Sequence, residues 1–183
     1  MLRKLPKVLV VDDSKMFLQI LILQLKQSVC AEIVPAGSLA EIDVLLQQHD
    51  FDVALLDLNL PDAPSGEAID AVLAKHIPVI VFAGDCSDQT RKRLWKKKIV
   101  DYVLKEGAES LEYAVRQVCR ILKNRTYKAM VVEDSDTVRS MVAGLLRVHC
   151  FQVFEACNGK EGLELLGQHP DMRLVITDYA MPF

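Results

Sequence analysis

The chain has 183 residues, 51% of them hydrophobic, and a formal net charge of -3. This length exceeds one ordinary domain but falls short of two, and the apolar content is sufficient to fill a core. The weak negative charge excludes bulk attraction to nucleic acid or an anionic membrane, and no apolar stretch approaches the roughly 20 residues that cross a bilayer.

Short β-rich runs alternate with helical patterns along the first two thirds of the chain. Strands are predicted at residues 7–11, 32–35, 53–56, 78–83 and 102–104. Helices are predicted to begin near Ser14, Leu39, Ser65, Ser87 and Ala108. The alternation predicts an α/β fold, a doubly wound five-stranded parallel sheet in the order 2-1-3-4-5 with helices on both faces.

The chain contains the same pair of motifs twice. The sequence VVDDS at residues 10–14 returns as VVEDS at residues 131–135, and DLNLP at 57–61 returns as DYAMP at 178–182. The offset is 121 residues in each case, which predicts a repeat aligned throughout without a gap. The second copy is therefore expected to form the first half of the same fold, with three strands in the order 2-1-3.

Three acids of the first copy fall at predicted strand ends. Asp12 and Asp13 follow the first strand and Asp57 follows the third. In a sheet of this order, the ligand crevice lies between the carboxyl ends of those two strands, where the winding reverses. Three neighbouring carboxylates repel one another, so they predict a hard divalent cation, and Mg²⁺ suits them. A carboxylate beside Mg²⁺ favours phosphoryl transfer, with Asp57 as nucleophile.

With these motifs, residues 5–124 resemble a complete receiver domain of two-component response regulators, with the fold of chemotaxis regulators. Residues 127–183 resemble the first half of another receiver. Domains are accordingly expected at residues 1–124 and 125–183. The resemblance implies a cytoplasmic protein, in agreement with five cysteines that include no C-x-x-C pair.

The resemblance also implies a role for each site residue. Asp57 is expected to accept a phosphoryl group from the phosphohistidine of a histidine kinase or phosphotransfer protein, and Lys105 to contact that group. The implied Mg²⁺ ligands are Asp12, Asp13, Asp57 and the backbone carbonyl of Asn59. The resemblance thus implies that the chain is not an enzyme, apart from the chemistry of its own phosphorylation and dephosphorylation.

The first copy departs from the family pattern at its switch. Receivers carry Thr or Ser at the end of the fourth strand, where this chain has Ala83. Tyr102 matches the aromatic residue that rotates on activation in the family. Phosphorylation is expected to persist, while its coupling to the usual loop movement loses a hydrogen bond.

The second copy carries its own acids. Glu133 and Asp134 match the metal-binding pair and Asp178 matches both the third metal ligand and the phosphoacceptor, while Arg139 fits a family position where the first copy has Leu18. The chain ends before a fourth strand, so an exposed strand edge is expected to lead to self-association, swapping or partial disorder. The end is expected to be a trimmed boundary, with the remainder carrying an output domain. Tandem receivers of this family often precede a diguanylate cyclase.

The basic run Arg91–Lys98 is predicted to be one solvated face of a helix rather than a nucleic-acid site. By resemblance, this helix belongs to the surface formed by the fourth helix, fifth strand and fifth helix, through which receivers dimerise. A protein contact through Leu94 or Trp95 is therefore expected.

Two alternatives compete with the phosphoacceptor reading. In the first, the chain is a pseudo-receiver that serves protein contacts without phosphorylation, and Ala83 marks its disabled switch. In the second, it is a magnesium phosphatase of the haloacid-dehalogenase type. That chemistry needs an acid two residues after the nucleophile, where this chain has Asn59 and Ala180.

Overall fold

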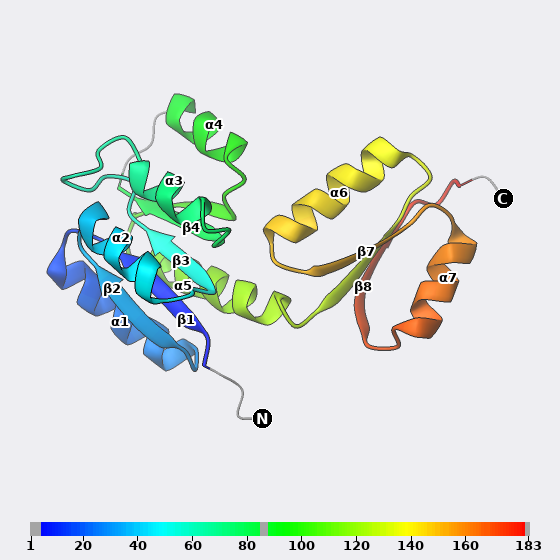
Figure 1. Ribbon diagram of the computed structural model, residues 1–183, viewed down its shortest axis with the longest axis horizontal. Helices are drawn as coiled ribbons and strands as arrows, with labels where there is room; N and C mark the ends of the chain where they lie inside the picture. The colour runs from blue at the N-terminus through cyan, green and yellow to red at the C-terminus, as the bar shows by residue number, and fades with distance from the viewer. Residues whose placement is uncertain (1–4, 85–87, 182–183) are drawn as a thin grey trace. The chain divides into compact units, whose positions relative to one another are not determined.

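The computed structural model describes residues 5–84 and 88–181 (Figure 1). The chain divides into two compact units, Met1–Leu122 and Lys123–Phe183. Across the described ranges, every helix lacks either the length or the apolar character needed to cross a bilayer.

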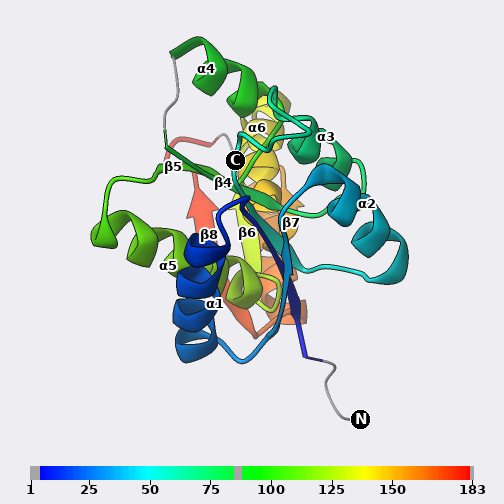
Figure 2. The same cartoon turned by 90° about the vertical axis from the view of Figure 1, so that its left-hand side faces the viewer.

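The first unit is a five-stranded parallel sheet covered by helices on both faces. Its strands are β1 (Lys7–Val11), β2 (Glu32–Ala36), β3 (Val53–Leu56), β4 (Val79–Ala83) and β5 (Asp101–Leu104). Its helices are α1 (Lys15–Ser28), α2 (Leu39–Gln48), α3 (Glu67–Leu73), α4 (Asp88–Lys96) and α5 (Ala108–Asn124). The strand order is β2-β1-β3-β4-β5, which confirms the predicted topology. Figure 2 shows α1 and α5 on one side of this sheet and α2 and α3 on the other.

Helix starts follow the predicted caps with one difference. The Ser14 side chain accepts a hydrogen bond from the N–H of Phe17 and so caps α1. Helix α3 begins two residues later than predicted, because Gly66, with φ of 82°, makes a left-handed turn after Ser65. Ser87, the predicted start of α4, lies outside the described residues.

The inner strands are buried along their length, as expected for a sheet covered on both faces. One core cluster lies on the side of α2 and α3. It includes Leu9, Val11, Ile42, Ala54, Leu56, Ile69, Val79, Val81, Ala83 and Leu94.

The burial of Leu94 corrects one expectation from the basic run. Leu94 of α4 is 0% exposed, so it packs inward and is not available for a protein contact, whereas Trp95 is 47% exposed. Leu94 joins α4 to the core cluster. Polar contacts hold this helix and the residue after it: Arg93 donates to the carbonyl of Ser65, and Lys97, which directly follows α4, pairs with Asp70 of α3.

The second unit is a three-stranded parallel sheet with two helices. Its elements are β6 (Lys128–Val132), α6 (Asp136–Val148), β7 (Gln152–Ala156), α7 (Gly159–Gln168) and β8 (Met172–Thr177). The order β7-β6-β8 is the predicted 2-1-3 arrangement.

The two units are out of step by one residue in their middle, so the prediction of a gapless repeat was wrong. Strand β7 and helix α7 lie 120 residues after β2 and α2, because α6 has 13 residues where α1 has 14. The offset returns to 121 in β8, which contains one extra residue where its pairing with β6 shifts between Lys128 and Ala129.

Strand β8 forms an edge of its sheet. Its Val175 and Ile176 side chains are 42% and 38% exposed, and within the described residues only β6 pairs with it. An edge of this kind presents unpaired backbone groups to any partner strand. Self-association stays a prediction.

Replacing Gly66 tests the turn that begins α3. Gly66→Ala should lower the free energy of unfolding of the first unit by about 1–2 kcal/mol, since alanine is strained in the left-handed region. Its Cβ would also lie 3.1 Å from Cδ1 of Leu58. Urea unfolding followed by fluorescence of the single tryptophan, which lies in this unit, measures the change. Gly84→Ala is the control, because its Cβ would meet no atom within 4 Å. Equal midpoints for the two variants would contradict the expectation.

Candidate functional site

Three carboxylates meet at the carboxyl ends of β1 and β3. Val11 pairs with Leu56 across these strands, so the next residues, Asp12 and Asp57, emerge side by side. The N–H of Asp57 donates to the carbonyl of Val11 at 2.9 Å, which holds the two strand ends together. Carboxylate oxygens of Asp12, Asp13 and Asp57 lie within 4.8 Å of one another. The structure therefore brings together the acids that the sequence singled out.

The three acids differ in burial. Asp12 is 2% exposed and Asp57 is 9% exposed, whereas Asp13 faces solvent. Backbone N–H groups orient the buried pair: Ser14 donates to Oδ1 of Asp12 at 3.0 Å and Asn59 donates to Oδ1 of Asp57 at 3.3 Å. These bonds leave the second oxygen of each carboxylate directed to another partner.

That partner is Lys105, the residue after β5. Its ammonium Nζ lies 2.6 Å from Oδ2 of Asp12 and 2.7 Å from Oδ2 of Asp57. Its backbone N–H donates to the carbonyl of Ala83 at 2.9 Å, which fixes the start of the side chain against β4. One cation thus bridges both buried acids.

Burial and the neighbouring charges shift the pKa values of Asp12 and Lys105 in opposite directions. Burial raises the pKa of the Asp12 carboxyl, and the hydrogen bond from Lys105 offsets that rise only in part. Burial alone would lower the pKa of Lys105, but its hydrogen bonds to Asp12 and Asp57 outweigh the effect and raise it. The ammonium therefore stays charged at neutral pH.

Two aromatic side chains beside Lys105 were not predicted. Its Nζ lies 4.8 Å from the ring centroid of Phe17 and 5.9 Å from that of Phe82. Sequence offered one signal for them, since Phe17 stands in the helical turn after the acid pair and Phe82 directly precedes the switch position.

The last residue of β4, where the resemblance to receivers implies a switch hydroxyl, carries none. Ala83, the last residue of β4, is fully buried in the core cluster, and Tyr102 of β5 is half-buried against the same cluster. A methyl group at this point cannot donate a hydrogen bond to an anion in the crevice.

The donor set fits a hard divalent cation. Carboxylate oxygens from Asp12, Asp13 and Asp57 converge within one coordination sphere, and oxygen ligands in this number, completed by water, are those that Mg²⁺ takes. The exposed carboxylate of Asp13 leaves the crevice open for exchange with solvent.

The second unit repeats the acid cluster. Oxygens of Glu133, Asp134 and Asp178 lie within 4.8 Å of one another. Asp134 and Asp178 are exposed and Glu133 is half-buried. The N–H of Ser135 donates to Oε1 of Glu133 at 3.0 Å, as Ser14 does to Asp12 in the first unit. Among the residues that the structure describes, none of these acids is paired with a lysine.

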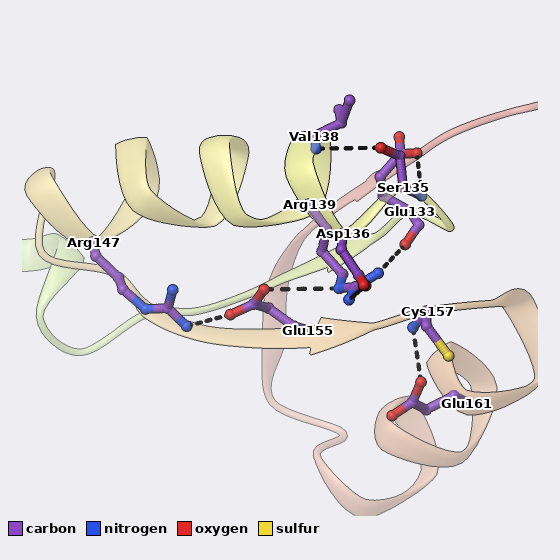
Figure 3. A network of polar contacts seen from close by, with 9 residues as sticks. All are labelled: Glu133, Ser135, Asp136, Val138, Arg139, Arg147, Glu155, Cys157 and Glu161. Carbon is purple, nitrogen blue, oxygen red and sulfur yellow. Dashed lines mark hydrogen bonds and ion pairs between the residues drawn. The ribbon is translucent and has the colours of Figure 1, made fainter.

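Arg139 contacts the backbone at Glu133, one of these acids (Figure 3). Its Nη1 donates to the backbone carbonyl of Glu133 at 2.7 Å, and it also bonds Asp136. Its Nε lies 3.8 Å from Glu155, which Arg147 contacts at 2.6 Å. The guanidinium thus fixes the backbone of the loop that carries the acids, rather than neutralising them.

Residues 8–116 match the family model described as the response regulator receiver domain. Among curated proteins, the two-component response regulator ORR11 of Oryza sativa subsp. indica is 45% identical over 53 residues, which cover 29% of this chain and 36% of that protein. ORR5 of Oryza sativa subsp. japonica is 43% identical over 53 residues, covering 29% and 40%. The chain therefore matches well under half the length of these relatives.

Solved structures match more of the chain. One described as a two-component system response regulator/GGDEF domain protein is 38% identical with a TM-score of 0.88, over 97% of this chain and 72% of its own. The chemotaxis response regulator CheY4 of Vibrio cholerae has a TM-score of 0.55 and 23% identity, over 63% of this chain and 99% of its own. The second likeness shows the fold alone.

The raised pKa of Asp12 predicts a pH-dependent effect of its removal. A carboxyl whose pKa is higher in the folded state than its ordinary 3.8 destabilises the fold once it is ionised. Asp12→Asn should therefore raise the free energy of unfolding at pH 7 in EDTA. The gain should shrink as the pH falls toward 3.8, where the carboxyl is protonated in the folded state. Urea titrations at several pH values measure it, and Asp43→Asn, on the exposed face of α2, serves as the control. A constant gain at all pH values would contradict the assignment.

Proposed function

The chain belongs to the family of response regulator receiver domains, and we propose that its first unit is the phosphoacceptor module of a two-component phosphorelay. Receiver domains of this family interact with histidine kinases or phosphotransfer proteins. In this proposal, Asp57 accepts the phosphoryl group from such a partner. The observation that carries it is the ion-pair bridge that Lys105 makes between Asp12 and Asp57, at the carboxyl ends of β1 and β3 where the winding of the sheet reverses.

The residues of the crevice divide the work of transfer. A carboxylate oxygen of Asp57 bonds to the phosphorus of a phosphohistidine as the P–N bond breaks and its electron pair returns to the imidazole nitrogen. Lys105, 2.7 Å from that carboxylate, is placed to follow the negative charge onto the phosphoryl oxygens. The backbone N–H of Asn59 donates to Oδ1 of Asp57 and holds that oxygen in place.

We assign the same crevice to Mg²⁺. Asp12, Asp13, Asp57 and the backbone carbonyl of Asn59 would hold the ion. Bound there, it supplies positive charge that shields the phosphoryl oxygens from the acids. That Asp12 and Asp57 already share one ammonium supports the assignment, because the crevice is built around positive charge.

The complete acceptor set disfavours both alternatives. A pseudo-receiver would not need to retain a buried nucleophile, two further acids and a bridging lysine. A haloacid-dehalogenase phosphatase would need an acid where Asn59 stands, and the matching family model is that of a receiver. Ala83 instead alters the readout: the acceptor is kept while the hydroxyl that draws in the loop is replaced by a methyl group.

The second unit and the output are assigned by similarity and geometry. We propose that Glu133, Asp134 and Asp178 form a second acceptor site, with Asp178 as nucleophile, in a receiver of which this unit is the first half. The GGDEF protein that matches both units supports an output enzyme of the diguanylate cyclase type in the whole protein. The cytoplasm is the compartment consistent with this role.

Phosphorylation of Asp57 is directly testable. The chain is incubated with Mg²⁺ and acetyl phosphate, the acyl phosphate is reduced with borohydride, and the modified aspartate is located by mass spectrometry. We expect modification at Asp57, its loss in Asp57→Asn, and its suppression by EDTA. A Lys105→Ala variant should be phosphorylated about 10- to 100-fold more slowly, since a charge-assisted contact in the transition state is lost.

Asp50→Asn is the matched control, since this carboxylate lies before β3 at the opposite end of the sheet. An unmodified Asp57 in a folded, Mg²⁺-binding protein would overturn the assignment and favour the pseudo-receiver.

We also propose that the chain self-associates, through the edge of β8 in preference to the surface of α4, β5 and α5. Ile176→Lys, which places a charge on that edge, should convert a concentration-dependent dimer to monomer in light scattering. Leu163→Lys, at an exposed apolar residue of α7, and Trp95→Lys, on α4, should not. Loss of the dimer only in Trp95→Lys would move the interface to α4, and a monomeric parent chain would exclude both.

A further inference from the structure

The ammonium of Lys105 is bordered by two aromatic rings. Nζ lies 4.8 Å from the centroid of Phe17 and 5.9 Å from that of Phe82, and the two centroids are 5.5 Å apart. Both distances fall within the range in which a cation is attracted to the face of a ring. The ammonium thus contacts two carboxylates and two rings at once.

The two rings reach this place from different elements. Phe17 lies in the first turn of α1, whose Ser14 cap follows directly after the acid pair. Phe82 is the penultimate residue of β4 and is 2% exposed. Its neighbours Val81 and Ala83 belong to the core on the side of α2 and α3, so Phe82 points to the opposite face, where α1 lies (Figure 2).

The second unit shows the site without this arrangement. The position equivalent to Phe17 is Val138, whose N–H donates to the side chain of the capping Ser135 (Figure 3). Phe17 donates to Ser14 in the same way. Its acids have no lysine partner within the described residues. The serine cap forms with an aliphatic residue at this position in the second unit, so the cap itself does not require the aromatic ring of Phe17.

We propose that Phe17 and Phe82 are positioning residues, which hold the Lys105 ammonium against Asp12 and Asp57 before a phosphoryl group arrives. Lysine has a long flexible side chain, and its contact with the acceptor is productive only when that chain is ordered. Ala83 has no hydroxyl with which to order the incoming anion, so the placement of Lys105 carries more of that task. The part that concerns phosphoryl transfer rests on the proposed function, and the placement of Lys105 does not.

The placement is tested on the metal-free chain by NMR of the lysine side chains. Protons on the ε-carbon of Lys105 should resonate upfield of those of exposed lysines because they lie near the ring faces, and Lys105→Gln identifies the signal by removing it. Phe17→Leu should move the signal toward the exposed value, whereas Phe17→Tyr, which keeps the ring, should leave it in place. Phe51→Leu removes a ring at the other end of the sheet and should have no effect. A signal that is not shifted, or that does not respond to Phe17→Leu, would overturn the placement.

The contribution to transfer is tested with acetyl phosphate and Mg²⁺. Phe17→Leu should reduce the rate constant for phosphorylation of Asp57 by about 3- to 30-fold, the range that a partly desolvated cation–π contact supports, and Phe82→Leu by less. Phe17→Tyr should restore it. In a Lys105→Ala background, Phe17→Leu should have no further effect, because its action passes through the lysine.

Equal slowing by Phe17→Leu with and without Lys105 would overturn the proposal, since the ring would then act through the fold. Absence of phosphorylation in the parent chain, with the Lys105 signal shifted as expected, would overturn the proposed function while confirming the placement of the lysine.

Discussion

The rest of the site depends on a single electrostatic requirement. Two carboxylates that the fold buries side by side must be neutralised. Asp12 and Asp57 lose hydration where they lie and repel each other, so a counter-charge has to be delivered to both. Lys105 supplies it from 93 residues further along the chain than Asp12. Parallel strands make that possible, because their carboxyl ends share one edge of the sheet whatever their separation in sequence.

The two units share the backbone arrangement around their acids but stabilise it with different side chains. Both begin with a buried strand, a serine cap and an acid that accepts the serine N–H. Where the first unit packs Leu18 into its core, the second has Arg139, which binds the carbonyl of Glu133 and reaches Glu155. One unit thus stabilises the helix after its acids by apolar burial, and the other by a guanidinium that serves several acceptors.

The sequence predicted the topology well because the inner strands are unbroken apolar runs and several helices begin at a residue that can cap them. It placed the acids correctly because they directly follow predicted strands. It failed where the deciding property was a side chain's direction. Leu94 sits in a basic run that reads as a solvated face, yet points inward. Phe17 and Phe82 belong to no motif, and only folding brings them to Lys105. The one-residue difference between the repeats was hidden because both flanking motifs stay aligned.

The two acid clusters differ in how far water reaches their carboxylates, and this gives them different responses to ionic strength. In the first, Asp12 and Asp57 are buried and in contact with the Lys105 ammonium, so dissolved monovalent ions screen these two charges little. In the second, Asp134 and Asp178 face water, and at 0.1 M salt the screening length of about 10 Å exceeds the spacing of the acids, so simple salt relieves their repulsion only in part. The second cluster is consequently the more sensitive of the two to the valence of the surrounding cations.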